Sequence, residues 1–259
     1  MSFGDIKILY NMIFRHGHGA SHADRLNDFY SSQAGDYDNF RKRFLIGRSE
    51  MMKLTAETQK DAIWVDMGGG TGANLENIAE MVPQMKKIYI VDLASSLLEV
   101  ARERIKKNGW TNVVAVEADA TTFTPDEGYA DIVTFSYSLT MIPDWFAALD
   151  NARRILRPGG TIGLVDFFVS RKWPGENQIR HSWFTRNYWP VHFSTDNVFL
   201  SHDHIPYLNR YFEMTHYEDG YLKIPYIMIV RVPYYIFIGK KPDNGVTSAE
   251  TDHRDESVE

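Results

Sequence analysis

The sequence predicts one α/β domain in which a doubly wound sheet binds a nucleotide-like cofactor. Three observations predict it. Short apolar runs typical of strands recur along residues 60–166, a glycine-rich turn follows the first of them, and an acidic residue closes or follows the next two. Since ligands of such sheets bind at the carboxyl ends of the strands, these features are expected to form one site.

The first strand and the turn after it are the strongest signal. The apolar run Ala62–Val65 precedes Asp66-Met67-Gly68-Gly69-Gly70-Thr71-Gly72, and a helical pattern begins near Asn74. Glycine at 68, 70 and 72 permits positive φ and lets a ligand touch the backbone. A helix start also offers unpaired N–H groups to an anion, so a cofactor with anionic or polar groups is expected here.

The later strands follow in order along the chain. The second ends in Asp92, about 20 residues after the turn, where an acid can accept hydrogen bonds from ribose hydroxyls. The third leads to Asp119 and Ala120, and the fifth follows the turn Arg157-Pro158-Gly159-Gly160. The expected ranges are 88–92, 113–117, 131–137 and 162–166, with two further strands at 212–218 and 234–239.

This order of motifs over residues 60–166 resembles the class I S-adenosylmethionine-dependent methyltransferases. The resemblance implies a Rossmann-like, seven-stranded, mostly parallel sheet with helices on both faces, and S-adenosyl-L-methionine as cofactor. It implies that Asp66 and the glycines contact the methionine part, Asp92 the ribose, and Asp119 the adenine. The implied cofactor-binding residues are Tyr37, Arg41, Asp66, Gly68, Gly70, Gly72, Asp92, Leu93, Asp119, Ala120 and Ser136.

Simpler interpretations of these residues stay open. Gly68, Gly70 and Ala73 also satisfy the dinucleotide fingerprint G-x-G-x-x-G/A, although no hydride-transfer site is evident. Asp119 before Thr121 is also typical of a capped turn. Tyr37 and Arg41, four residues apart on an expected helix, would close over the methionine end of the cofactor or simply form a solvated face.

Composition narrows the class of protein. The 259 residues are 44% hydrophobic, enough for one full α/β core with additions, and no apolar run is long enough to span a membrane. The formal charge of −6 comes mostly from residues 243–259, which hold six acids and one arginine. A nearly neutral body argues against nucleic acid as substrate. The absence of cysteine and of an evident leader favours a cytoplasmic chain.

Three regions are expected along the chain. Residues 1–30 form an N-terminal helical arm, 31–240 the methyltransferase domain, and 241–259 a disordered acidic tail. In the arm, Asp5–Arg15 carries apolar residues on one helical face. That face either packs on its own domain or lies on a membrane surface, which would make the protein peripheral on a membrane, the endoplasmic reticulum in a eukaryote.

A narrower resemblance rests on two further motifs. Gln33-Ala34-x-x-Tyr37-Asp38-x-x-Arg41 with Gly47-Arg48, and His202-Asp203-His204-Ile205-Pro206-Tyr207-Leu208, resemble the methyltransferase part of betaine lipid synthases. That family makes diacylglyceryl-trimethylhomoserine by methylating an amine three times. The resemblance implies a lipid substrate and a carboxypropyl transferase, as a partner domain or protein, that supplies it.

Residues 167–209 are expected to be the substrate lid, because they form the longest connection at the carboxyl edge and are rich in aromatic residues. The candidate catalytic residues are Tyr137, His192 and Tyr188, with Tyr137 best placed to accept the amine proton. Arg180 and Arg186 would anchor a carboxylate. Trp183, Trp189 and Tyr207 would surround a methylated ammonium.

We expect no metal site, although histidines occur at 16, 18, 22, 202 and 204, because methyl transfer needs no metal and the first group lies in a glycine-containing turn. Three functions remain open. The first is N-methylation of a lipid head group, the second is methylation of a small soluble amine, phenol or acid, and the third is a non-catalytic scaffold for a membrane or protein.

Overall fold

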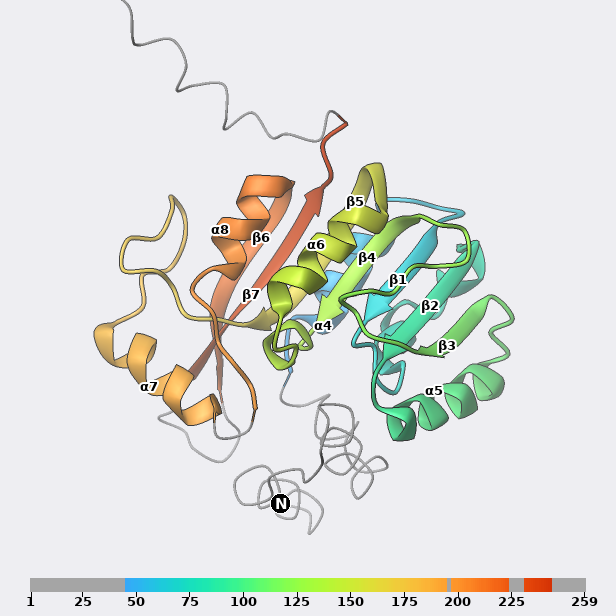
Figure 1. Ribbon diagram of the computed structural model, residues 1–259, viewed down its shortest axis with the longest axis horizontal. Coiled ribbons are helices and arrows are strands. Elements are labelled where there is room, and N and C mark those ends of the chain that lie inside the picture. The colour runs from blue at the N-terminus through green and yellow to red at the C-terminus, as the bar shows by residue number, and fades with distance from the viewer. Residues whose placement is uncertain (1–44, 195–196, 224–230, 244–259) are drawn as a thin grey trace, which may run out of the picture.

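The computed structural model describes residues 45–194, 197–223 and 231–243, and in them a seven-stranded sheet lies between two layers of helices (Figure 1). The strand order is β3-β2-β1-β4-β5-β7-β6. The sheet is parallel from β3 through β5, whereas β7 runs antiparallel to both β5 and β6. The predicted fold class is therefore confirmed.

The central strands are buried apolar runs, as expected for strands covered on both faces. All of β1 and β4 is buried. The third strand has the predicted bounds, and the others lie within a few residues of prediction except that β5 and β6 extend further. The strands are β1 Ile63–Met67, β2 Lys87–Asp92, β3 Val113–Glu117, β4 Ala130–Ser136, β5 Leu156–Phe167, β6 Glu213–Lys223 and β7 Arg231–Lys240.

Two hydrophobic clusters, one on each face, hold the helices to the sheet. Alternation along β1 turns Trp64 toward α4 and α5, whereas Val65 faces α6 and α8. In Figure 1, α6 and α8 lie in front of the sheet. The α-helices are α4 Arg48–Ala56, α5 Ser95–Asn108, α6 Trp145–Ile155, α7 Trp183–Ser194 and α8 His204–Tyr211.

The segment after the glycine turn differs from the prediction. It is not a regular α-helix but two 3-10 helices, η1 Ala73–Ile78 and η2 Val82–Gln84. Pro83 lies inside η2, and a proline there would clash with the carbonyl four residues earlier in a continuous α-helix. The glycine turn therefore leads into two short 3-10 helices and not into one α-helix. A third 3-10 helix, η3 Leu139–Met141, follows β4.

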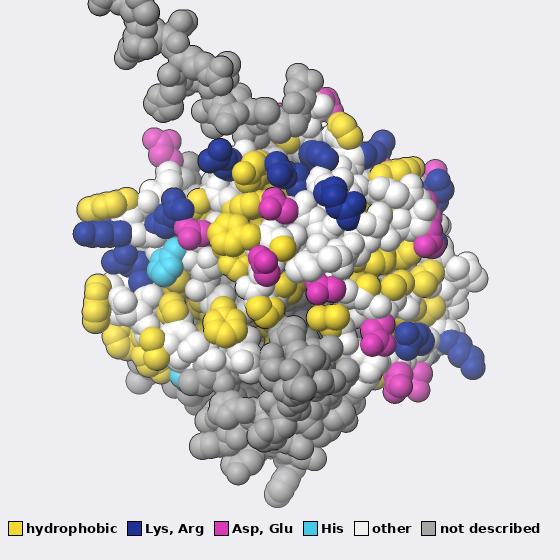
Figure 2. Space-filling model, in the orientation of Figure 1, with side chains coloured by type: hydrophobic (Ala, Val, Ile, Leu, Met, Phe, Trp, Pro, Cys, Tyr) yellow, Lys and Arg dark blue, Asp and Glu magenta, His cyan; other side chains and the backbone are white. Residues whose placement is uncertain are grey.

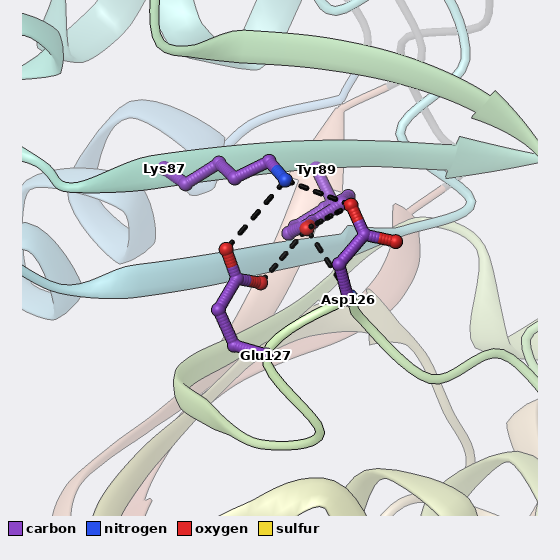
Figure 3. A network of polar contacts seen from close by, with 4 residues as sticks. All are labelled: Lys87, Tyr89, Asp126 and Glu127. Carbon is purple, nitrogen blue, oxygen red and sulfur yellow. Dashed lines mark hydrogen bonds and ion pairs between the residues drawn. The ribbon is translucent and has the colours of Figure 1, made fainter.

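A polar cluster fixes the loop between β3 and β4 at the amino end of β2 (Figure 3). Lys87 Nζ lies 2.9 Å from Asp126 Oδ2 and 3.5 Å from Glu127 Oε1. The Tyr89 hydroxyl lies 2.8 Å from Glu127 Oε2 and 3.1 Å from Asp126 Oδ2, and it accepts the Asp126 backbone N–H. Hydrogen bonds with Tyr89 and Asp126 raise the pKa of Lys87.

The connection between β5 and β6 contains α7 and α8, and α7 lies at one extremity of the molecule (Figure 1). No helix within the described ranges is long and apolar enough to cross a bilayer. The expected helix at Asp5–Arg15, the residues Tyr37 and Arg41, and the tail from residue 244 lie outside the described residues.

Candidate active site

A cavity of about 320 Å³ lies at the carboxyl ends of β1, β2, β3 and β4. Residues from these four strands and the segments after them meet there because parallel strands end at the same edge of the sheet. The structure brings seven of the predicted site residues to its wall. They are Gly68, Gly70, Asp92, Leu93, Asp119, Ala120 and Tyr137.

The glycine turn is shaped by positive φ angles and by close contact with η3. Gly68 and Gly70 have φ of 67° and 56°. A Cβ atom built on Gly68 would lie 2.4 Å from Ser138 Cβ, closer than real Cβ atoms approach one another. The turn therefore requires glycine at 68 both for its conformation and for its packing, and bare backbone forms this wall of the cavity.

Asp92 closes β2 with its carboxylate held on both sides by backbone. Oδ2 accepts the N–H of Gly70 at 2.9 Å, and Oδ1 accepts the N–H of Ala94 at 2.8 Å. Each carboxylate oxygen has two lone pairs and can accept more than one hydrogen bond, so a carboxylate here suits a ribose hydroxyl. The acid is thus oriented at the cavity and tied to the glycine turn.

The far wall combines one acid with apolar side chains. Asp119 Oδ1 accepts both the backbone N–H and the hydroxyl of Thr121, at 2.8 and 2.7 Å. The capped turn that the sequence indicated is therefore present, and it places the acid at the cavity wall. Leu97, Ile142 and Ala147 line the same space. An apolar slot with one acid suits a flat ring that carries an exocyclic amine.

Tyr137 follows β4 with a backbone that non-glycine residues seldom adopt, at φ 51°. Its hydroxyl donates to the carbonyl of Ile46 at 2.8 Å, and its ring centroid lies 4.7 Å from that of Phe167. Strained backbone of this kind concentrates at functional sites. Tyr137 lines the cavity, but its hydroxyl already donates to a carbonyl, and its catalytic role stays a prediction.

Comparison with known proteins gives a family, curated relatives and structures of similar fold. The model of the ubiE/COQ5 methyltransferase family matches residues 19–190. The chain belongs to that family. Curated relatives include a demethylmenaquinone methyltransferase of Lactococcus lactis, 26% identical over 55% of this chain and 58% of its own length. The ubiquinone/menaquinone biosynthesis C-methyltransferase UbiE of Francisella tularensis is 34% identical over 40% of this chain and 42% of its own.

The chain thus spans about half the length of the curated relatives it matches. Among solved structures, a Bacillus halodurans protein has a TM-score of 0.59 at 20% identity, over 76% of this chain and 99% of its own. The N-methyltransferase NodS of Bradyrhizobium japonicum, solved with S-adenosyl-L-homocysteine, has a TM-score of 0.55 at 14% identity, over 78% and 87%. Similarity at this identity concerns the fold.

As a member of this family, the chain is an S-adenosylmethionine-dependent methyltransferase. The cavity fits that cofactor, because glycine backbone, the acid at the end of β2 and the apolar slot lie in a row along its wall. Asp92 would hold the ribose, and Asp119 with Ala120 the adenine. The dinucleotide interpretation and the non-catalytic scaffold give way to this assignment.

The acid of the first strand, Asp66, is placed differently from expectation. It is fully buried and does not line the cavity. Its Oδ1 accepts the hydroxyl of Thr134 at 2.7 Å, and its Oδ2 accepts the amide of Asn74 at 3.3 Å. Asn74 Oδ1 in turn accepts Arg48 Nη1 at 3.4 Å and the Ser136 hydroxyl at 3.5 Å. Asp66 therefore supports the glycine turn from below.

The sequence did not predict this buried network. Ser136 and Gly72 were expected to contact the cofactor. Both lie outside the cavity wall. A Cβ atom on Gly72 would meet Ile90 Cδ1 at 2.7 Å, so glycine is needed there for packing on β2. Polar residues inside otherwise apolar strands, such as Thr134 and Ser136, were the available signal.

None of the described residues between 167 and 209 lines the cavity, so the structure does not bring the expected lid to it, and a lid over residues 167–209 stays a prediction. Trp183 is 73% exposed and Trp189 only 4%, so the two point to opposite sides of α7 and form no cage. Tyr188 and His192 stack on each other, with centroids 5.5 Å apart, on the exposed part of the same helix. Neither is placed for catalysis.

The other substrate candidates also lie elsewhere. The Tyr207 hydroxyl donates to Asp150, and its ring packs on Trp145 and Phe146. Arg180 covers the ring of Trp173 at 4.3 Å, away from the cavity. Arg186 lies on α7 and does not line the cavity. A carboxylate anchor formed by these arginines is not supported.

Of the two histidines in the His202–Leu208 motif, His202 is exposed and His204 serves packing. His204 is fully buried, lies edge-on to Trp145, and has its pKa lowered to about 3 by burial. Its Nδ1 lies 3.4 Å from the Tyr235 hydroxyl. Elsewhere Glu50, His216 and Glu218 bring one ligand-type atom each within 4.8 Å of one another. The expectation of no metal stays a prediction that a cation-binding assay would test.

Proposed function

We propose that this methyltransferase acts on the amine of a membrane-resident lipid head group, namely the homoserine amine of a diacylglyceryl-homoserine lipid. The observation that carries the proposal is where the family match ends. It stops at residue 190, and the motif His202–Leu208, which resembles betaine lipid synthases, lies beyond it. The proposal thus rests on the part of the chain that the family match does not include.

Methyl transfer to an amine requires little chemical activation by the protein. S-adenosylmethionine supplies an activated methyl group, so the protein mainly has to align an amine for in-line displacement. An ammonium must first lose a proton, and Tyr137 is the predicted side chain at the cavity with a group able to relay it. In this proposal the phenol exchanges its hydrogen bond to Ile46 for one to the amine or to a water.

The test is methylation of vesicles that contain diacylglyceryl-homoserine, with deuterated S-adenosylmethionine and mass spectrometry of the extracted lipid. We expect successive gains of one, two and three labelled methyl groups. Tyr137→Phe should lower kcat at least tenfold while changing the Kd for S-adenosylmethionine less than threefold. Absence of labelled lipid, while the chain still binds S-adenosylmethionine, would refute the proposed substrate.

The second candidate is methylation of a ring carbon in a quinone precursor, favoured by the names of the curated relatives. Both candidates place the acceptor in a membrane. The same assay with demethylmenaquinone in the vesicles separates them, because the labelled methyl group then appears in the quinone fraction and not in the lipid head group. A soluble amine, phenol or acid would instead be labelled without vesicles.

A further inference from the structure

Helix α7 is apolar on two opposite sides. On the inner side Trp189 is buried and packs on Phe193, with ring centroids 5.3 Å apart. On the outer side four side chains are exposed and fall within one arc of the helix. They are Trp183 at 73%, Phe184 at 63%, Tyr188 at 40% and Val191 at 71%.

A helix that holds to its domain by one apolar side has no folding reason to carry a second. The outer side chains are also ordered against one another, since Phe184 and Tyr188 stack with centroids 5.0 Å apart and planes 13° apart. The connection before the helix adds Trp173, which is 69% exposed. Large exposed apolar groups gathered in this way mark an interaction surface.

The charge around this surface selects the partner. Residues 171–194 contain four basic side chains and one acid, although the whole chain has a formal charge of −6. Lys172 and Arg180 lie 5.5 and 4.3 Å from the ring of Trp173. Figure 2 shows hydrophobic and basic side chains together at the edge of the molecule where Figure 1 places α7 and the connection before it.

We propose that the outer face of α7, together with Trp173, lies in the interface of an anionic lipid bilayer. Tryptophan, tyrosine and basic residues are the groups that favour this interface. The helix has 12 residues and is about 18 Å long, so it lies in the plane of the membrane and does not cross it. The inference differs from the expected contact through residues 5–15 and holds for either membrane-resident acceptor.

The surface is also connected to the active site. Ring contacts run from Tyr137 at the cavity to Phe167 at 4.7 Å, and from Phe167 to Phe193 of α7 at 5.2 Å. The connection that carries α7 starts at the end of β5, on the same edge of the sheet as the cavity. Docking through α7 would therefore bring the cavity edge to the membrane that holds the acceptor.

The absence of cysteine makes a direct test simple. Val191→Cys and Tyr129→Cys each provide one thiol for an environment-sensitive dye. Tyr129 is an exposed residue just before the amino end of β4, whereas the connection to α7 leaves the carboxyl end of β5. When vesicles of phosphatidylcholine and phosphatidylglycerol are added to the full chain labelled at 191, the fluorescence emission of the dye should shift to shorter wavelength and become more intense. The label at 129 should not change.

Sedimentation with the same vesicles gives the second measurement. The triple variant Trp183→Ser, Phe184→Ser, Val191→Ser should bind at least tenfold more weakly, and Tyr129→Ser should bind as the parent does. Normal S-adenosylmethionine binding by the triple variant shows that it has folded. Equal vesicle binding by parent and triple variant would overturn the proposal.

A parent that forms dimers through this face, with no dye shift on vesicles, would also overturn it and identify a second copy as the occupant. The test is independent of the substrate, because it scores lipid binding without turnover. If the dye shift occurs but no lipid amine is methylated, the proposed function fails while the membrane face stands.

Discussion

At the scale of single residues, the acids of this methyltransferase divide between two tasks. Asp92 and Asp119 stand at the cavity wall with part of their hydrogen-bonding capacity used by backbone or by a threonine. Asp66 is buried beneath the same wall and bonded to Asn74 and Thr134. Aspartate side chains therefore do two things here: Asp92 and Asp119 line the cavity, and Asp66 holds the glycine turn that forms part of its wall.

Asp92→Ala removes an acceptor for the ribose and frees two backbone N–H groups that now orient the glycine turn. Hydrogen bonds to a charged group contribute roughly 1.5–3 kcal/mol each. We expect the Kd for S-adenosylmethionine, measured by calorimetry, to rise at least tenfold with the circular dichroism spectrum unchanged.

Asp126→Ala is the matched control, because that carboxylate lies at the other end of β2 in the cluster of Figure 3. It should leave the Kd within twofold of the parent. If Asp92→Ala also leaves the Kd unchanged, Asp92 serves only to hold its turn.

At the scale of elements, strands were predictable and helices facing two environments were not. The range 113–117 was predicted without error, because a short apolar run between polar turns is typical of a strand, although β3 lies at the edge of the sheet and only Val113 in it is buried. In α7, Trp183 and Trp189 read alike in the sequence, yet one is exposed and the other buried. Apolar residues on both sides leave no periodicity to tell them apart.

The site was predictable to a similar degree. Glycines and acids at strand ends have fixed places in a parallel sheet, so Gly68, Asp92 and Asp119 were found. The network through Arg48, Asn74 and Asp66 joins segments far apart in the chain, and nothing local indicates such pairs. The 3-10 helices after the turn depended on one proline and on packing, which outweigh local propensity.

The cluster in Figure 3 gives a prediction about the loop between β3 and β4. Tyr89→Phe keeps the buried ring but removes the hydroxyl that joins two carboxylates and a backbone N–H. The free energy of unfolding, measured in urea, should fall by about 1–2 kcal/mol. The affinity for S-adenosylmethionine should stay the same, since the cluster lies at the end of β2 opposite Asp92.

Lys87→Met tests whether the hydroxyl or the ion pair matters in that cluster. Its partner Asp126 has a side chain that is 83% exposed, and ion pairs in contact with water contribute less than about 1 kcal/mol. Equal losses from Tyr89→Phe and Lys87→Met would contradict the assignment of the main contribution to the tyrosine.

At the scale of the whole molecule, the sheet joins a half that builds the cavity to a half that, in our proposals, meets the membrane. The first, from β1 to β4, carries the cavity and lies within the family match. The second carries α7 and α8 and extends beyond the match at residue 190. The two halves join where β5 leads into the connection that contains α7 and α8. Because the cavity lies in the first half, we expect that substitutions in the second half can change the methyl acceptor without changing cofactor binding.

The stability of the whole domain should depend on pH through His204, which is buried between α6 and β7. It faces Trp145 and the Tyr235 hydroxyl, with Asp203 beside it on the chain. Its pKa is lowered from 6.5 to about 3 in the folded state by burial. Between these values the unfolded chain binds a proton that the folded chain does not, so stability falls as the pH falls through this range.

Other groups act in the same window, among them His202, whose pKa is also lowered by desolvation, and a variant isolates His204 from them. His181, with a pKa lowered to about 4 by burial, adds to the slope, whereas Asp166, with a pKa raised to about 6 by burial, opposes it. His204→Phe keeps a ring against Trp145 and cannot titrate. Urea denaturation of parent and variant from pH 4 to 7 should give curves that converge as the pH falls, by up to about 1.4 kcal/mol per pH unit below 6.5. Parallel curves, which differ by the same free energy at every pH, would contradict the prediction. They would show that the imidazole takes up its proton equally in the folded and unfolded chain and that the substitution changes packing alone.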